Sequence, residues 1–318
     1  MASPNLSELI TTTLRHREGK LADNVSNGNA LLSRLSSKGN IRTVSGGRTI
    51  VEELEYAENS TFKYYSGYEE LDISPSDVMT AAEYVWKQSA AVVSVSGLEG
   101  DIQNAGKEAI INLVDKRITN AEKTMMNQTS IGIYSDGTGF GGKQITGLQA
   151  QVANDPSTGT VGGINRATWT FWRNKYGSNA TWTSAVIKGY MKNLFMQCTR
   201  GTDKPDLVTM DANTYEIFWD ALTDLQRVNH EKDKASMGWE AIGFQNADVI
   251  YDGDSGHPAN TLYMLNTDYI FFRPHVNRNF VPLDRRDSIN QDAYVVPIVF
   301  AGNLTMSNAS LQGVYFKS

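Results

Sequence analysis

The sequence predicts an α+β fold, in which helices and strands are mixed without the regular strand–helix–strand alternation of a parallel α/β protein. Residues 98–128 carry the strongest helical pattern, strand-like runs lie near both ends of the chain, and a helix–strand–helix stretch lies between them. With 318 residues, 40% of them hydrophobic, the chain can bury a sizeable core as one large domain or two intertwined ones.

Charges are sorted near the start of the chain. Residues 1–48 hold seven basic and three acidic side chains, a net charge of +4, whereas residues 51–73 hold seven acidic and one basic, a net charge of −6. The whole chain has a net charge of −6, which argues against a protein that simply coats DNA. Charge runs are commonly solvated faces, but two adjacent segments of opposite sign favour contact with other surfaces.

The first 48 residues predict an arm. A short amphipathic helix can begin after Ser3-Pro4, an irregular or partly helical stretch follows, and Gly46-Gly47 closes it. Residues 49–75 then predict an extended β-hairpin with a turn at residues 58–60. One strand would hold Val51, Leu54 and Tyr56, and the other Phe62, Tyr64 and Tyr68. Since isolated two-stranded ribbons are marginal in water, we expect this hairpin to lie on another surface.

The side chains of the hairpin suit such contacts. Its tyrosines offer rigid amphipathic area of the kind enriched at interfaces, and Gly67 permits a bend or a close backbone approach. Its acidic side chains can meet a basic arm or another surface of a neighbouring molecule. The candidate intermolecular contact residues are Glu52, Glu53, Glu55, Tyr56, Lys63, Tyr64, Tyr68, Arg34 and Arg42.

The long helical pattern over residues 98–128 forms one apolar stripe opposite charged residues. A helix of this length runs about 40 Å. We expect it to end near Gly132, before the glycine-rich stretch SDGTGFGGKQ. The stripe consists of Ile102, Ala105, Ile110, Leu113, Val114, Ile118, Ala121 and Met125.

The rest of the chain predicts two further helices and a series of strands. An aromatic cluster at residues 169–182 precedes a helix over 184–198, the strand DLVTM and a helix over 213–227. Strands are expected at ADVIYD, NTLYMLN, YIFFRPH, DAYVVPIVFAGN and LQGVYFK.

Two loops resemble ligand-binding motifs but lack their context. Gly137-x-Gly139-x-x-Gly142 matches the dinucleotide fingerprint, yet that site needs a preceding strand and a following helix, and here a long helix precedes it. The stretch from Asp252 to Gly256 resembles the start of a calcium loop, but position twelve is Tyr263 rather than a bidentate glutamate.

Other catalytic or metal signals are weak. The four histidines show no metal-ligand spacing, and Cys198 lies on the apolar face of its predicted helix, as a small core residue does. We therefore expect no enzyme, no metal and no cofactor. A cytosolic nucleotide-binding enzyme that uses the glycine loop is the alternative from a different functional class.

The sequence also predicts a compartment. No apolar stretch is long enough to cross a bilayer, and the polar start has no apolar signal core, so we expect neither a membrane partner nor secretion. A single cysteine fits a reducing compartment.

The order of these elements resembles the major capsid proteins of tailed bacteriophages, whose fold is shared with encapsulin nanocompartments. The segment VEELEYAENSTFKYYSGYEELD resembles the family's extended loop, and TAAEYVWKQSAAVVSVSGLE resembles its return into the spine helix. SDGTGFGGKQITGLQ and GTVGGINRATWTFWRN are similar to stretches of one branch of the family, and NLTMSNASLQGVYF resembles its closing strands. The resemblance extends from about residue 30 to the end of the chain.

The resemblance implies a division of the chain. Residues 1–48 would be the N-terminal arm and 49–75 the extended loop. Residues 76–182 would form the peripheral domain with the spine helix 98–128, and 183–265 the axial domain. Return strands in 266–318 would complete both domains.

The resemblance also implies a non-enzymatic subunit that assembles as hexamers and pentamers into an icosahedral or prolate shell around double-stranded DNA. We expect a virion capsid assembled in the host cytoplasm, with scaffolding, portal and decoration proteins as further partners. Some relatives cross-link a loop lysine to a neighbour's asparagine, for which the candidates here are Lys63 with Asn303 or Asn308. An encapsulin-like shell around cargo enzymes, or another virion or tail protein, are the alternatives.

Overall fold

The computed structural model describes residues 28–97, 107–223, 242–252, 256–284, 286–287 and 290–318, with side chains of the long helix described from residue 116 onward. The short helix expected after Ser3-Pro4, the first residues of the expected helix 98–128 and the end of the third expected helix lie outside these ranges.

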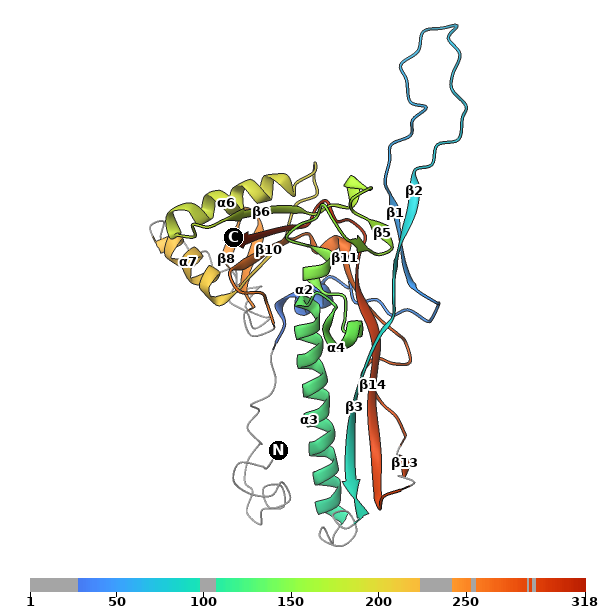
Figure 1. Cartoon of the computed structure of the whole chain (residues 1–318), viewed down its shortest axis with the longest axis vertical. Coiled ribbons are helices and arrows are strands. Elements are labelled where there is room, and N and C mark those ends of the chain that lie inside the picture. Colours follow the sequence, from blue (N-terminus) through green and yellow to red (C-terminus); the bar gives the residue numbers. More distant parts are fainter. Residues whose placement is uncertain (1–27, 98–106, 224–241, 253–255, 285, 288–289) are drawn as a thin grey trace.

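A long helix and a tall sheet form the lower body of the molecule (Figure 1). Helix α3 (Lys107–Tyr134) runs beside strand β14 (Ala293–Met306), which pairs with the whole of β3 (Lys87–Ser96) in antiparallel register. Three shorter strands also pair with β14, namely β11 (Ile270–Pro274), β12 (Val281–Pro282) and β13 (Arg286–Asp287).

Helix α3 ends at Tyr134, two residues past Gly132 and directly before the glycine-rich stretch, so its expected end is confirmed. The last turn continues because Ile133 and Tyr134 are both fully buried, and this burial outweighs the low helical propensity of one glycine. Of the predicted apolar stripe, Met125 is buried and Ile118 and Ala121 pack against the same core.

A second sheet, with two helices packed on it, lies to one side of this body. Its strand order is β6-β15-β10-β7-β9-β8, with β15–β6 and β7–β9 parallel and the other pairs antiparallel. The strands are β6 (Lys175–Asn179), β15 (Gly313–Lys317), β10 (Thr261–Leu265), β7 (Leu207–Met210), β9 (Ala247–Tyr251) and β8 (Ile242–Phe244).

Helices α6 (Ser184–Gln197) and α7 (Ala212–Thr223) cover this sheet through apolar residues spaced by three and four. On α6 the buried positions include Ile187, Met191, Leu194 and Cys198. The expected α+β class, the second helix and all the expected closing strands are confirmed.

The segment before the extended loop is folded onto the same body. Helix α2 (Ala30–Ser37) begins at Asn29, whose side chain accepts a hydrogen bond from the Leu32 amide. It ends at Gly39, whose φ of +70° allows the Asn40 amide to donate to the Leu35 carbonyl. Leu31 and Leu35 are fully buried.

The predicted hairpin exists, but with a different second strand. Strand β1 (Ile50–Glu55) pairs with β2 (Met79–Tyr84), so that Ile50 lies opposite Tyr84 and Glu55 opposite Met79. The prediction that residues 62–68 form the second strand is therefore wrong, and residues 56–78 form one long loop. Burial explains the pairing, because alternate residues of β1 and the Ala82–Tyr84 end of β2 share a core under the hairpin.

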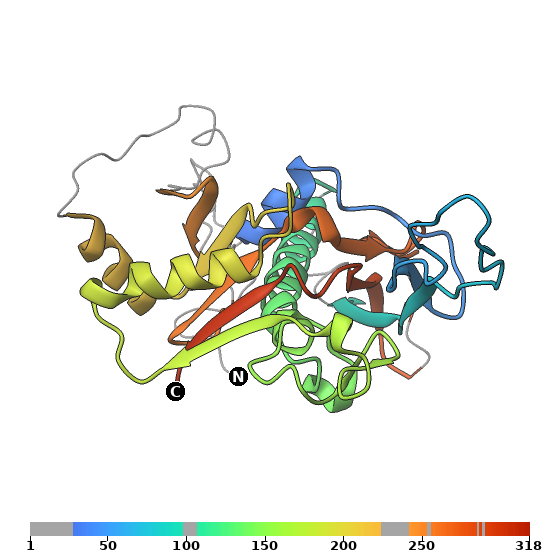
Figure 2. The ribbon, with the colours of Figure 1, turned by 90° about the horizontal axis from the view of Figure 1, so that it is seen from above.

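Short elements complete the described structure. They are α4 (Gly139–Gly142), α5 (Leu148–Gln151), β4 (Thr160–Val161), β5 (Ile164–Asn165) and the 3-10 helices η2 (Thr170–Trp172) and η5 (Thr267–Tyr269). Seen from above, the extended loop and the α6–α7 layer lie at opposite ends of the molecule (Figure 2). The domain boundaries proposed from the sequence remain predictions.

Candidate assembly surface

The loop of residues 56–78 stands clear of the rest of the molecule (Figure 1). Its large side chains have no core to enter: Tyr64 is 91% exposed, Ile73 is 94% exposed, and Tyr68 is fully exposed. Phe62 and Tyr65 are exposed as well. Phe62 and Tyr64 contact each other edge to face, with ring centroids 5.3 Å apart, but both rings stay exposed. Such a projecting group of aromatic and aliphatic side chains marks a contact surface for another molecule.

Short-range polar contacts order the loop. The Asn59 side chain accepts hydrogen bonds from Thr61, and the hydroxyls of Ser60 and Ser76 meet across the loop at 3.3 Å. Lys63 donates to the Glu70 carbonyl. Because these contacts are local and exposed, they shape the loop without fixing it to the body.

The foot of the loop, by contrast, is bound tightly to the body. Glu52 is buried and accepts two hydrogen bonds from Arg273, at 2.7 and 2.8 Å, and a third from Thr305 at 2.8 Å. The Tyr84 hydroxyl donates to the Met306 carbonyl at 3.0 Å. The loop is therefore a projecting segment on a rigid base.

The predicted acidic contact residues lie on two different faces of strand β1. Glu52 faces its own chain, so its assignment as a contact to a neighbour is corrected: the alternation of β1 points it inward to Arg273. Glu53 and Glu55 lie on the exposed face of the same strand and remain available to another molecule. Tyr56 is half-buried at the foot, whereas Lys63, Tyr64 and Tyr68 are all exposed on the loop.

The predicted basic contact residues also differ in whether they face their own chain or solvent. Arg34 is paired inside its own chain, 3.1 Å from Asp206 and 3.4 Å from Asp248, and its role as a contact to a neighbour stays a prediction. Lys38 binds Asp206 at 3.0 Å and Asp268 at 2.7 Å. Sequence reasoning missed these acids because they lie far along the chain.

Arg42 remains exposed. Its guanidinium lies over the Phe271 ring at 5.2 Å from the centroid, and it is the arm's candidate for an outward contact.

Asp206 shows how the arm is held. Burial by itself would raise the pKa of this carboxyl, but hydrogen bonds from Thr267 and the nearby Lys38 ammonium outweigh it and lower the pKa below its usual value. The carboxylate is therefore charged at neutral pH, and it joins the arm helix to strand β7 and to η5.

The two asparagines predicted as cross-link partners of Lys63 have different surroundings. Asn303 is buried, and its amide donates to the Val85 carbonyl at 2.9 Å and accepts from the Thr146 amide at 2.9 Å, so its side chain is used within the chain. Asn308 is half-buried and accepts from Ser310. Lys63 with Asn308 is the pair that this geometry leaves open.

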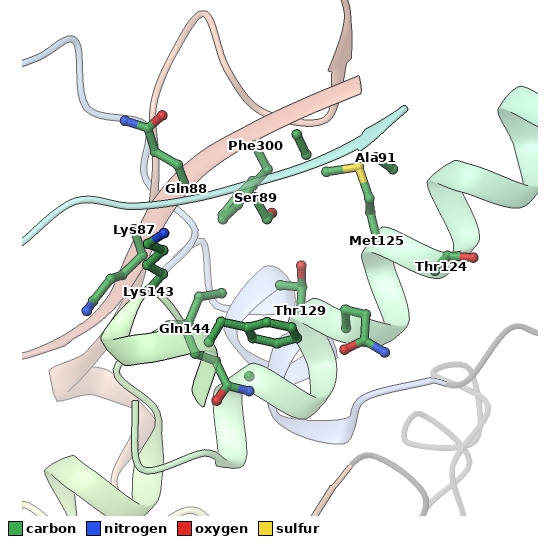
Figure 3. Close-up of a pocket in the computed structure, with 15 residues that line it drawn as sticks. Lys87, Gln88, Ser89, Ala91, Thr124, Met125, Thr129, Lys143, Gln144 and Phe300 are labelled. Carbon is green, nitrogen blue, oxygen red and sulfur yellow. The ribbon is translucent and has the colours of Figure 1, made fainter. Parts of the chain in front are cut away.

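An apolar pocket of about 380 Å³ lies between α3, β3 and the glycine-rich turn. Figure 3 shows Lys87 and Lys143 at one end of it and Met125 at the other. The turn itself places Phe140 at a φ of 55°, follows a helix rather than a strand, and leads into α5, a helix of only four residues. None of the residues described as lining the pocket is a carboxylate, an imidazole or a thiol, so it offers no acid–base pair.

The remaining candidate chemical groups are structural. Burial raises the pKa of the Cys198 thiol to about 12 and lowers that of His257 to about 4, so both are neutral at pH 7. Asp252, which begins the stretch that resembles a calcium loop, is buried and accepts hydrogen bonds from the Tyr134 hydroxyl and the Ala30 amide. Within the described ranges there is no cluster of three metal-binding side chains, and no described helix is long and apolar enough to span a membrane.

Comparisons with known proteins give one consistent result at the level of fold. No family model and no curated protein matches the sequence. Among solved structures, the capsid of cyanophage A-1(L) matches with a TM-score of 0.70 and 16% identity, covering 95% of this chain and 96% of that one. The chain has the capsid fold of tailed phages. The expected fold is thereby confirmed.

The same fold occurs in an encapsulin shell and in the capsid of another phage. The SrpI encapsulin of Synechococcus elongatus matches with a TM-score of 0.59 and 9% identity, covering 94% of this chain and 92% of that one. The capsid of the myovirus XM1 matches with a TM-score of 0.58 and 12% identity, covering 96% and 97%. At such identities the likeness concerns the fold alone.

Proposed function

We propose that this chain is the major capsid protein of a tailed phage, a non-enzymatic subunit that assembles with copies of itself into a closed shell around double-stranded DNA. The observation that carries the proposal is the extended loop, whose aromatic side chains are exposed and project away from the body. The near full-length likeness to a cyanophage capsid protein supports the same function.

The architecture gives this proposal a physical form. Each copy would lay its loop on a neighbour and receive another neighbour's loop, so that heterologous contacts repeat around rotation axes and the shell closes. The body around α3 and β14 would be the peripheral domain, and the six-stranded sheet with α6 and α7 the axial domain at the centres of hexamers and pentamers. Glu53, Glu55 and the exposed tyrosines would be the loop's contacts.

Expression of the chain and electron microscopy of the product test the proposal. We expect closed particles. A matched variant replaces residues 61–75 by a short Gly-Ser linker, which can join Ser60 to Ser76 because their hydroxyls lie 3.3 Å apart. We expect this variant to give folded subunits without particles, since the deleted residues contribute nothing to the core.

Two results would contradict the proposal. One is a wild-type chain that stays a small species at all concentrations and in the presence of a scaffolding protein. The other is a loop-deleted variant that forms the same particles as the wild type.

An encapsulin-like shell is the second candidate, supported by the likeness to the SrpI encapsulin. The contents of native particles separate the two: double-stranded DNA in a virion capsid, a cargo enzyme in an encapsulin. A virion capsid would assemble in the bacterial cytoplasm with portal, scaffolding and decoration proteins, and neighbouring genes for terminase and portal would agree with it.

A further inference from the structure

Three aromatic rings gather at the foot of the extended loop. Tyr56 follows β1, and Trp169 and Phe171 lie at the start of η2. The ring centroid of Tyr56 is 5.6 Å from each of the other two, which are 6.1 Å apart. Together with Asp77, the rings line an open hollow of about 350 Å³, here called the aromatic hollow.

Tertiary contacts build this hollow before any ligand arrives. The Tyr56 amide donates to the Val78 carbonyl at 3.0 Å, which places Tyr56 beside the Asp77 segment. The Glu83 amide donates to the Gly162 carbonyl at 2.8 Å, which fixes the β4–β5 turn against β2. Gly162 is required there, because a Cβ would lie only 2.9 Å from that of Ala82. The buried Trp172 indole donates to the Val161 carbonyl at 3.0 Å and holds η2 in place.

The chemistry of the aromatic hollow suits a cation. Aromatic faces attract an ammonium or guanidinium group within about 6 Å of the ring centroid. The centroids form a triangle with sides of 5.6 to 6.1 Å, and Trp169 stands at 74° to Tyr56 and at 66° to Phe171, so the rings form walls of the hollow that are inclined to one another. The carboxylate of Asp77 adds a full negative charge on the wall.

No cation of the described part of the chain occupies this hollow. Among the described residues, the cations that lie over aromatic rings are Arg42 and Arg273, and both lie over Phe271. Asp77 forms no ion pair with any described residue and is exposed. Trp169 is 46% exposed, so the hollow opens to the outside.

We propose that the aromatic hollow binds a lysine or arginine side chain of a second copy of the chain when copies associate. This rests on the proposed function, because the hollow lies at the root of the loop that would cross a neighbour. The exposed basic side chains Arg42 and Arg48 show that a second copy has suitable groups at its surface. The bound side chain adds a charge-specific contact at the root of the loop, whose tip is aromatic.

The deciding measurement is a density map of assembled wild-type particles. We expect a lysine or arginine of a neighbouring copy in the hollow, its charged group within about 6 Å of the ring centroids. Particles whose hollow is empty, or is filled by its own chain or by a small cation, overturn this inference and leave the proposed function intact. A chain that forms no particles overturns both.

Two carboxylate variants give a second readout. Asp77→Asn removes the charge on the hollow, and Asp284→Asn removes one from an exposed segment after β12, outside the extended loop. We expect particles of Asp77→Asn to release at least threefold more free subunit than the wild type at the same salt concentration, and Asp284→Asn particles to match the wild type. Isolated subunits of both variants should unfold at the wild-type temperature. Equal release from both variants would contradict the proposal.

Discussion

The arm and the extended loop are adjacent in sequence and opposite in charge, yet they have different partners. The arm helix α2 buries two leucines, and Arg34 on it and Lys38 after it form ion pairs with three aspartates of the body. The loop exposes its aromatic side chains and forms hydrogen bonds mainly with itself. A run of charge therefore does not say whether its partners are in the same chain. The apolar residues determine where the charges find their partners. A segment whose leucines are buried in the core also places its charged side chains against the body of the same chain.

The largest expected effect tests whether the arm is part of the folded body. Leu35→Ala should lower the free energy of unfolding by about 2–5 kcal/mol, because it leaves a cavity under α2. Tyr68→Ala on the loop should change it by less than about 0.5 kcal/mol, because that side chain is fully exposed. Denaturant unfolding of isolated subunits measures both. If both variants changed the free energy of unfolding equally, the arm would not be more firmly part of the folded body than the loop.

A smaller effect is expected at the boundary between body and loop. Glu52→Gln should cost about 3 kcal/mol, because it leaves the half-buried guanidinium of Arg273 without its carboxylate. Glu53→Gln, one residue away on the exposed face, should leave unfolding nearly unchanged but weaken particle assembly. If Glu53→Gln destabilised the subunit as much as Glu52→Gln, the inward and outward faces of β1 would be wrongly assigned.

The smallest expected effect is on the pH dependence of subunit stability, to which two carboxylates contribute differently. The pKa of both Asp206 in the body and Asp72 on the loop lies below the usual value of 3.8. A lowered pKa in the folded state gives stability that is fully present above the unfolded pKa and is lost as the pH falls through the folded pKa. Asp206→Asn should therefore reduce the loss of stability below about pH 4.

Asp72 supplies the control for this experiment. Its lowered pKa comes from hydrogen bonds with Ser74 inside an exposed loop, so Asp72→Asn should leave the acid unfolding curve of the subunit in place. Unfolding followed between pH 5 and pH 2 compares the two. The arm would be held by something other than its ion pairs if Asp206→Asn had no more effect than Asp72→Asn.

Much of the fold was predictable because its signals are local. Helix α6 and strands β7, β9, β10, β11, β14 and β15 follow from apolar periodicity, and the structure places each near its expected position. The end of α3 was predictable as well, because the glycine-rich stretch begins directly after Tyr134. The second strand of the hairpin was not predictable from alternation, since residues 62–68 alternate in sequence but have no face to pack on.

The candidate surface was predicted as a region but not residue by residue. Tyr64, Tyr68 and Lys63 are exposed on the loop, whereas Glu52, Arg34 and Asn303 are used inside the chain. The aromatic hollow was missed because Tyr56 and Trp169 are distant in sequence. The aromatic cluster after residue 168 was the available signal, but it did not indicate which ring the loop would meet.

The sequence by itself determined the α+β class, the long helix, the charge-sorted arm and loop, and the absence of a complete dinucleotide motif, because each depends on neighbouring residues. Only the tertiary structure decided which charges face inward. Glu52 and Glu53 are adjacent and chemically identical, and the twofold alternation of a strand turns one to Arg273 and the other to solvent. The direction of that alternation is set by the core beneath β1, which residues distant in sequence supply.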